Sequence, residues 1–227
     1  IFPPFPENAE VMDIAASMNA AKDVGGDFYD FFRIDDDRIG FAIADVSGKG
    51  VPAAIFMAVS RTLLRATGIK GANPAECVTY SNELLAKESV KNMFVTIFYG
   101  IYNIKTGDIT YTNAGHNPPY ILKANGTVET LPMSNNIIVG VFDDFNFSEE
   151  TCHLDKGDTI VLFTDGVTEA IDIAEKEYGD DRLKDCLAKH SGNSCQQIID
   201  AIKADVSVFV GEAEQSDDIT ILTLKRR

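Results

Sequence analysis

Short segments of strand character follow one another in pairs along this chain, and their spacing restricts the fold more than any other feature. Strands are expected at residues 11–19, 28–34 and 38–45, and the turn Asp35-Asp36-Asp37 joins the last two as a hairpin. Further strands are expected at residues 94–103, 108–114, 119–123, 149–153, 159–164 and 219–224, with a loop at 133–147. Because helices do not alternate strictly with these strands, the order favours an α+β fold over a doubly wound parallel sheet.

Helical periodicity is concentrated after the third expected strand and near the C-terminus. The first helix begins near Pro52, a residue suited to an opening turn. The second begins near Pro74 with Asn73 as its cap and ends near Ser89, and two more helices are expected at residues 181–189 and 194–209. An apolar stripe predicts the buried face of the first helix; it consists of Val51, Ala54, Ile55, Ala58, Val59 and Leu63.

Composition excludes several classes of protein. With 227 residues, 45% of them hydrophobic, the chain can bury one large core. The net charge of −15 argues against a nucleic-acid surface, which is normally basic. No apolar run approaches the ~18 residues of a membrane span, and no signal-peptide pattern opens the chain. The four cysteines show no zinc or CxxC spacing, which indicates reduced thiols in a cytoplasmic protein.

Acidic residues stand at the ends of four apolar strand segments. Asp45 shares a strand face with the bulky apolar residues of the segment 39–43 by two-residue alternation. Asp27, Asp165 and Asp217 stand in the same relation to their own segments. Carboxylates gathered near a core raise one another's pKa, and a divalent cation relieves this by favouring every ionised form. An all-oxygen donor set suits Mg²⁺ or Mn²⁺ better than zinc, which recruits His or Cys.

A plainer interpretation of these aspartates stays open. An Asp-Gly pair such as Asp165-Gly166 is usually only a turn, and Asp27 or Asp217 alone is ordinary in a turn or a helix cap. Four such positions with matching alternation favour the metal hypothesis. The glycines that follow Asp45 and Asp165 also allow the backbone to approach a ligand closely.

Five motifs in a fixed order carry a family resemblance. They are VGGDFYD at residues 24–30, ADVSGKG at 44–50, NAGHNP at 113–118, FTDGVTEA at 163–170 and DDIT at 217–220. Together they resemble the PPM metal-dependent Ser/Thr protein phosphatases, in the bacterial SpoIIE/RsbU-like branch. One motif alone would be weak evidence, but five in order over nearly the whole chain are highly specific.

The resemblance implies a four-layer α-β-β-α sandwich, in which two central antiparallel sheets are flanked by helix pairs. It implies one phosphatase domain over residues 1–227, expected to be the C-terminal part of a longer regulatory protein. It also implies a site that holds two or more Mn²⁺ or Mg²⁺ ions. Asp27, Asp45, Asp165 and Asp217 are then the candidate catalytic residues.

The implied metal ligands follow from the motif positions. Asp45 resembles the bridging ligand, and the backbone carbonyl of Val46 resembles a ligand of one ion. Asp165 and Asp217 resemble the ligands of the second ion, and Asp27 resembles an acid that binds directly or through water. Asp218 adjoins Asp217 and stays open as the alternative ligand.

Three positions leave roles undecided. Ser47 stands where some members of the wider family have a histidine that is a candidate general acid. An arginine that holds phosphate in some relatives has no certain counterpart, and Lys22 is the nearest candidate for substrate binding, although a solvated lysine explains it equally well. His116 lies in a turn-rich segment and is interpreted as a loop histidine rather than a group at a pocket edge.

The resemblance implies hydrolysis of phosphoserine or phosphothreonine by a metal-activated water. Relatives act on anti-sigma-factor antagonists and often follow a sensor or receiver domain, which implies signal transduction in a stress response. Two alternatives stay open, a metal-dependent phosphatase of small molecules and a catalytically silent partner-switching module. The segment from Gly50 to Ser89 resembles a two-helix element that regulates relatives, so a switch of activity is expected there.

Overall fold

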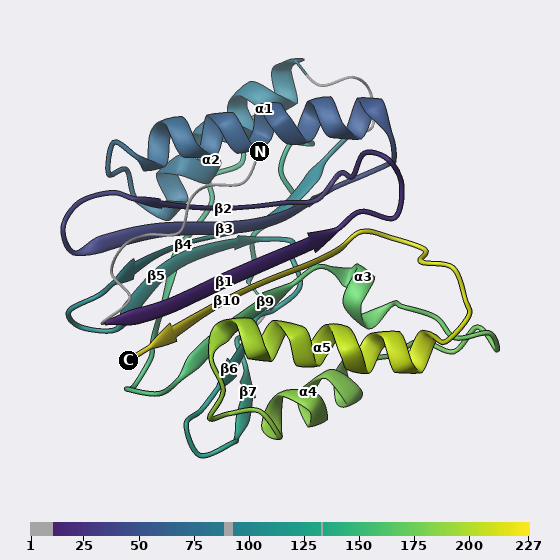
Figure 1. The fold of residues 1–227 in the computed structure, drawn as a ribbon. Helices are drawn as coiled ribbons and strands as arrows, with labels where there is room; N and C mark the ends of the chain where they lie inside the picture. Colours follow the sequence, from purple (N-terminus) through teal and green to yellow (C-terminus); the bar gives the residue numbers. More distant parts are fainter. Residues whose placement is uncertain (1–10, 89–92, 133) are drawn as a thin grey trace. The chain divides into compact units, whose positions relative to one another are not determined.

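A computed structural model describes residues 11–88, 93–132 and 134–227, which form two compact units (Figure 1). Unit 1 holds residues 22–116 and 132–153, and unit 2 holds the other described residues. Each unit contains one antiparallel five-stranded sheet with helices against it. The expected α+β class is confirmed, while the expected helix end at Ser89 lies outside the described residues.

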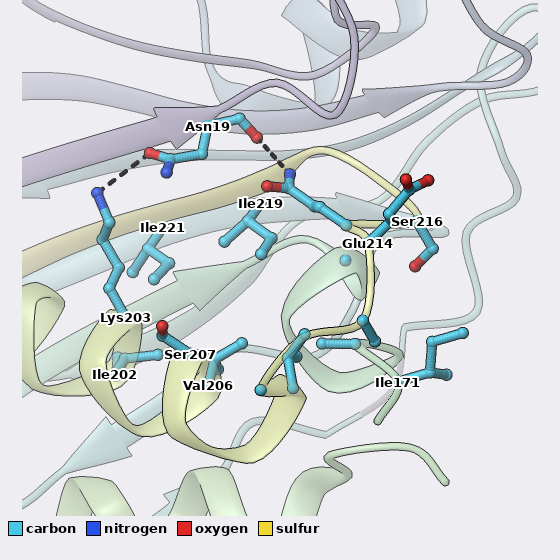
Figure 2. A pocket seen from close by; sticks show the side chains of 16 residues that line it. Asn19, Ile171, Ile202, Lys203, Val206, Ser207, Glu214, Ser216, Ile219 and Ile221 are labelled. Atoms are coloured by element: carbon cyan, nitrogen blue, oxygen red, sulfur yellow. Dashed lines mark hydrogen bonds between the residues drawn. The ribbon is translucent and has the colours of Figure 1, made fainter. Parts of the chain in front are cut away.

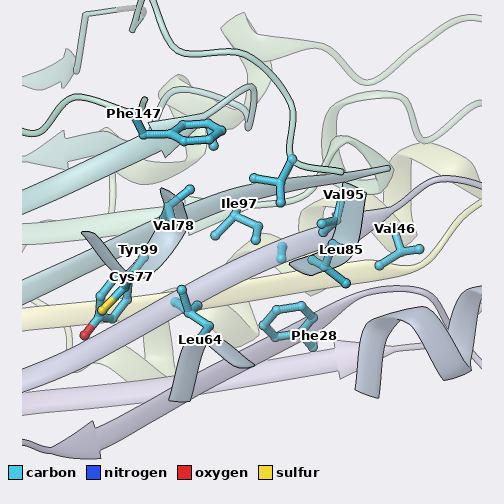
Figure 3. Packing of buried hydrophobic residues seen from close by; sticks show 14 of the residues in the cluster. Phe28, Val46, Leu64, Cys77, Val78, Leu85, Val95, Ile97, Tyr99 and Phe147 are labelled. Carbon is cyan, nitrogen blue, oxygen red and sulfur yellow. The ribbon is translucent and has the colours of Figure 1, made fainter. Parts of the chain in front are cut away.

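Unit 1 is built on the sheet β2-β3-β4-β5-β8. Its strands are β2 (Phe28–Arg33), β3 (Arg38–Val46), β4 (Val95–Asn103), β5 (Asp108–Ala114) and β8 (Glu150–His153). The helices α1 (Val51–Gly68) and α2 (Pro74–Glu88) pack against one face of this sheet. Figure 3 shows the resulting core, in which Phe28 and Val46 of the sheet meet Leu64, Val78 and Leu85 of the helices.

Small residues let α1 approach the sheet closely. The helix-facing residues of β3 include Ala42 and Ala44, which are fully buried. At the end of α1, a Cβ added to Gly68 would lie 2.6 Å from the Tyr99 hydroxyl and 2.7 Å from the Phe32 ring. Any larger residue at Gly68 would therefore push the helix off the sheet.

The buried face of α1 differs from the predicted stripe. The helix buries Ala53, Phe56, Ser60, Leu64 and Gly68. In contrast, the predicted Val51, Ile55 and Val59 are 63%, 62% and 45% exposed. The prediction was wrong because α1 carries apolar residues on two neighbouring faces, and helical periodicity does not indicate which of them meets the sheet.

An ion pair ties α1 to β2. The Asp30 carboxylate is 2% exposed, and its Oδ1 accepts a hydrogen bond of 2.6 Å from Nη1 of Arg65. Nε of Arg61 lies 3.3 Å from the other carboxylate oxygen. The Arg65 guanidinium also lies over the Phe32 ring, 5.1 Å from its centroid, which adds a cation–π contact. Asp30 therefore neutralises two arginines that would otherwise face an apolar core.

Unit 2 is built on the sheet β1-β10-β9-β6-β7. Its strands are β1 (Met12–Asn19), β6 (Tyr120–Leu122), β7 (Val128–Thr130), β9 (Thr159–Phe163) and β10 (Ile219–Arg226). Its helices are α3 (Asp165–Thr168), α4 (Asp180–Ala188) and α5 (Cys195–Val210). No expected strand or helix covers β7 or α3, because neither segment carries a periodic apolar pattern.

The core of unit 2 lies between the sheet and the helices α4 and α5. Val161, Phe163 and Ile221 of the sheet pack with Leu183 of α4 and Ile199 of α5. α5 begins with a capping box, in which the Ser194 hydroxyl accepts from the N–H of Gln197 and the Gln197 side chain accepts from the N–H of Ser194. This cap fixes the start of the helix that lies along β1 and β10.

Three smaller expectations can be compared with the described residues. Asn73 caps α2, because its Oδ1 accepts the N–H of Glu76 at 2.8 Å. Cys77, Cys152, Cys186 and Cys195 are all free thiols. Among the described residues, no helix has both the length and the apolar character needed to cross a membrane.

Replacing Asp30 by Ala should destabilise the protein by about 2 to 3 kcal/mol, because two arginines lose their buried counter-charge. The value lies below that for fully buried pairs because the Arg65 side chain is 36% exposed. Urea unfolding followed by circular dichroism measures the change. Asp36→Ala is the matched control, since its ion pair with Arg33 is exposed and should contribute little. Equal midpoints for both variants would contradict this role of Asp30.

Candidate metal and active site

Asp27 and Asp45 are neighbours across the β2–β3 ladder of unit 1. Phe28 pairs with Ala44 in antiparallel register, so the next pair outward is Asp27 and Asp45. Ala44 faces the helices, and alternation therefore directs Asp45 to the opposite face of the sheet. Two carboxylates side by side repel each other, so this position favours a bound cation.

The carbonyl of Val46 belongs to the same group of oxygens. A Cβ added to Gly26 would lie 3.0 Å from this carbonyl oxygen, so only glycine fits there without displacing the backbone. Gly26, which precedes Asp27, thus lies directly against Val46, which follows Asp45. Unit 1 therefore brings Asp27, Asp45 and the Val46 carbonyl into one short stretch of the β2–β3 ladder.

Ser47 has a structural role beside this group. Its N–H donates to the Phe94 carbonyl at 2.9 Å, and its hydroxyl accepts the N–H of Phe94 at 2.9 Å. Gly48 and Gly50 follow with φ of 89° and 77°, conformations that favour glycine, and the chain then enters α1. Ser47 therefore fixes the exit from β3, and its hydroxyl is occupied by a backbone hydrogen bond.

His116 lies one strand away from Asp45. Its Nδ1 is 2.9 Å from the hydroxyl of Thr96, which is the β4 partner of Asp45 in the ladder. Its backbone N–H donates to Oδ1 of Asn113 at 2.8 Å, and Asn113 donates back to the His116 carbonyl at 3.0 Å. The loop thus holds His116, as interpreted from the sequence, and directs its ring to the strand beside Asp45.

In unit 2, Asp165 lies beside the segment that contains Asp217 and Asp218. Asp165 opens α3, and the preceding Thr164 donates its N–H to the Thr220 carbonyl at 3.0 Å. A Cβ added to Gly166 would lie 2.0 Å from the Asp218 carbonyl oxygen, so the two backbones are in direct contact. A glycine after Asp165 is a steric requirement of this contact.

The two adjacent aspartates differ in their surroundings. Asp218 is 8% exposed, and its Oδ1 accepts the N–H of Ala21 at 2.8 Å. Asp217 is exposed, and its Oδ1 accepts the N–H of Asp218 at 2.9 Å. The side-chain amide of Gln215 holds this turn, because it donates to the carbonyls of Asn19 and Asp217 at 2.9 and 2.7 Å. Asp218 therefore fastens the end of β1, and Asp217 presents its carboxylate to solvent.

The pKa of Glu169 is affected by several carboxylates at this end of unit 2. Its pKa is raised, first by partial burial and then by the charges of Asp165, Glu177 and Asp217. Glu169 is not among the predicted site residues, although its place one helical turn after Asp165 could have indicated it. A cation near Asp165 and Asp217 would relieve the same repulsion.

The candidate ligands form two groups, one in each unit. Asp27, Asp45 and Val46 belong to unit 1, and Asp165 and Asp217 belong to unit 2. Within the described ranges, no three Asp, Glu, His or Cys side chains are gathered closely enough to hold an ion by themselves. The oxygen donors of each group nevertheless fit Mg²⁺ or Mn²⁺, which bind through one or two carboxylates, carbonyls and water.

Lys22 is exposed in the connection between β1 and β2. It precedes Asp27 by five residues and belongs to unit 1. This exposed position is compatible with both interpretations of Lys22, a phosphate-binding group and a solvated lysine.

This fold is that of the PP2C-type phosphatase domains. The chain is similar to the SiaA-PP2C domain of Pseudomonas aeruginosa, with a TM-score of 0.84, 21% identity, and coverage of 94% of this chain and 86% of that one. It is also similar to RsbX in complex with magnesium, with a TM-score of 0.73, 16% identity, and coverage of 97% and 98%.

The family model for Stage II sporulation protein E (SpoIIE) matches residues 35–227, and the chain belongs to this family. Among curated proteins, the phosphoserine phosphatase RsbU of Bacillus subtilis (strain 168) is 33% identical over 220 residues. That alignment covers 96% of this chain and 64% of RsbU, so the chain spans less than two thirds of that relative's length.

Glu169→Gln should stabilise the metal-free protein at pH 7 by up to about 0.5 kcal/mol, because it removes a repelled charge that is largely screened by water. The raised pKa means that the unfolded chain ionises first as the pH rises, so wild type loses stability between the unfolded pKa and the folded one. Below pH 4 both states are protonated, and the difference should vanish. Thermal unfolding in EDTA at pH 3.5 and 7 measures the stability difference between the variant and wild type. A difference that is the same at both pH values would contradict the electrostatic cause.

Proposed function

We propose that this chain is a metal-dependent protein-serine/threonine phosphatase domain, a phosphoric monoester hydrolase. The observation that carries the proposal is that a SpoIIE-family chain retains all four aspartates and that each unit brings two of them together. The relative RsbU is named a phosphoserine phosphatase, which supports phosphoserine as the substrate group.

The chain's own oxygens would hold the metal. The carboxylates of Asp27 and Asp45 and the carbonyl of Val46 are the proposed ligands in unit 1, with Asp45 as the bridging ligand. Asp165 and Asp217 are the proposed ligands in unit 2. Two or more Mn²⁺ or Mg²⁺ ions, when bound, would supply Lewis-acid activation of water and of the phosphoryl oxygens. The RsbX structure holds magnesium, which supports a hard divalent cation.

The surroundings of Asp218 support Asp217 as the ligand. The carboxylate of Asp218 is buried and accepts the N–H of Ala21, so a metal there would compete with a hydrogen bond that fastens β1. The Asp217 carboxylate is exposed, and the N–H that it accepts comes from the adjacent residue rather than from the distant segment after β1. Lys22, which is exposed, is proposed to meet the substrate phosphate with its ammonium group.

The remaining residues position these groups. The hydrogen bonds of Ser47 to Phe94 fix the turn that follows Asp45 and Val46. The close contact between Gly166 and Asp218 fixes the distance between the Asp165 and Asp217 segments. Preorganised carboxylates of this kind need little rearrangement when charge develops on the phosphoryl group, which is the main requirement of phosphoryl transfer.

The wider biological role is proposed from the relatives. We infer one phosphatase domain over residues 1–227 within a longer cytoplasmic regulatory protein that carries a sensor or receiver domain. Its proposed substrate is a phosphoprotein such as an anti-sigma-factor antagonist. The free thiols support a reducing compartment, and the net charge of −15 disfavours nucleic acid as a partner.

Wild type should release phosphate from a phosphoserine protein or an aryl phosphate in Mn²⁺, and EDTA should abolish the release. Asp45→Asn should lower kcat by about a thousandfold or more while the protein stays folded, because a ligand and its charge are lost. Asp36→Asn, an exposed aspartate in the β2–β3 turn, is the matched control and should keep wild-type activity.

The outcome separates the alternatives. Activity on sugar phosphates or cyclic nucleotides but not on phosphoserine protein would favour the small-molecule phosphatase. A folded chain that binds Mn²⁺ without any turnover would favour the silent partner-switching module. Normal turnover by Asp45→Asn would refute the assigned site.

We further propose that α1 and α2 regulate the site. α1 follows Asp45 and Val46 after one short turn, and its outward face exposes Val51, Ile55 and Val59. A movement of α1 would therefore be transmitted to the residues that bind metal.

In the longer protein, Mn²⁺ affinity and turnover should differ several-fold from those of the isolated chain. Ile55→Asp should reduce this difference, because it places a charge on the exposed apolar face of α1. Calorimetric titration measures the Mn²⁺ affinity of the longer protein and of the isolated chain. Identical affinities and rates in the two forms would count against regulation through this element.

A further inference from the structure

Unit 2 contains a cavity that the proposed metal ligands do not use. Its volume is about 380 Å³, which lies within the range of small ligand sites. Its walls come from α5, the start of β10, the end of β1, and the segments 166–171 and 211–216. All of these belong to unit 2, so the cavity is formed within one compact unit.

Apolar and polar residues share the lining of the cavity. Figure 2 shows Ile202 and Val206 of α5 below it, and Ile219 and Ile221 of β10 beside them. Ile171 closes one end. The apolar part of this lining suits a branched aliphatic side chain, because the cavity removes its apolar surface from water.

The lining of the cavity includes one cation, Lys203, and one carboxylate, Glu214. Nζ of Lys203 donates to the Ser17 hydroxyl and to Oδ1 of Asn19, each at 3.1 Å. Among the described residues, Lys203 forms no ion pair with a carboxylate, although the chain has 35 acidic residues. This half-buried ammonium is therefore available to an acidic group that arrives with the apolar one.

The cavity adjoins the proposed metal ligands along the chain. Gly166 and Ser216 line it, and they directly follow Asp165 and precede Asp217. The Gln215 amide braces the wall between them by its two bonds to backbone carbonyls. A peptide spans about 3.3 Å per residue, so a segment with its phosphate near these ligands reaches the cavity within a few residues.

We propose that this cavity is a specificity pocket for the protein substrate, which receives an aliphatic side chain from the segment that carries the phosphoserine. Lys203 pairs with an acidic residue next to that side chain. The proposal rests on the proposed phosphatase function and adds to it the chemistry of the substrate segment. The expected occupant is a peptide, because a peptide can place its phosphate near the proposed metal ligands and an apolar side chain in the cavity at the same time.

A series of phosphoserine peptides tests the pocket. In every peptide the residues around the phosphoserine are glutamates, except at one varied position. The varied position lies within five residues of the phosphoserine and carries Leu, Ala or Asp. With wild type and Mn²⁺, kcat/KM should be at least about tenfold higher for Leu than for Ala at one position, as expected for a filled apolar site. Asp at that position should be poorer than Ala.

Ser207→Trp fills the pocket, because Ser207 lines it and lies on the exposed side of α5. The Leu preference should then fall by about tenfold. Val208→Trp is the matched control: Val208 is the next residue, is 83% exposed and does not line the cavity, so this variant should keep the preference. The chain has no native tryptophan, so emission shows directly whether the new indole is buried in Ser207→Trp and exposed in Val208→Trp.

The outcomes separate this inference from the proposed function. If wild type releases phosphate from an aryl phosphate but shows no Leu preference at any position, the pocket assignment is wrong and the phosphatase remains. A Leu preference that survives Ser207→Trp with a buried indole would also overturn the assignment. If wild type fails on the aryl phosphate and on every peptide, the phosphatase proposal itself fails.

Discussion

The repulsion between neighbouring carboxylates is the constraint on which the rest of this structure depends. Asp27 directly precedes the last pair of the β2–β3 ladder and Asp45 directly follows it, and Asp165 lies against the Asp217 segment. Like charges directly opposite each other in a sheet are destabilising, so a chain without a use for them would replace one. The pKa of Glu169 is raised first by partial burial and then by the charges of Asp165, Glu177 and Asp217. In the proposed site, a divalent cation would relieve this repulsion.

The two faces of the β2–β3 hairpin differ in role: one packs against the helices, and the other carries Asp45. Even-numbered residues meet the helices, and among them Asp30 binds Arg61 and Arg65. Asp45 points to the opposite face, where a charged side chain does not disturb the helix-side core. The same short hairpin therefore anchors α1 through Asp30 and carries the proposed ligands Asp27 and Asp45 at its end. If these residues bind metal as proposed, movement of α1 would be coupled to metal binding without a long pathway.

Sequence patterns predicted most of the strands because alternation and turn residues are local signals. The capped start of α2 at Asn73 was equally local. The buried face of α1 was wrong because two apolar faces compete, and only the space beside Ala42 and Ala44 selects Phe56 and Leu64. Helical periodicity contains no information about this tertiary fit.

The candidate site was predictable in its residue types but not in its packing. Motif order placed the aspartates, whereas alternation carried less information than expected, since Asp165 and Asp217 lie outside β9 and β10. The choice between Asp217 and Asp218 depends on the N–H of Ala21, a partner 197 residues away in the chain. The ion pairs of Asp30 with α1 are likewise long-range, so no local pattern could indicate them.

The proposed recognition of a phosphoprotein by this chain has two separable parts. A metal site recognises only the phosphoryl group, which every phosphoserine shares, so it cannot distinguish one substrate from another. Discrimination requires contacts with the residues around the phosphoserine, and apolar contacts discriminate only where a shaped cavity excludes water. The segment that contains Gln215 belongs to both proposed parts, because its amide bonds the Asp217 carbonyl and the same residue lines the cavity. In this proposal, the loop between α5 and β10 is therefore the element in which catalysis and substrate choice are most directly joined.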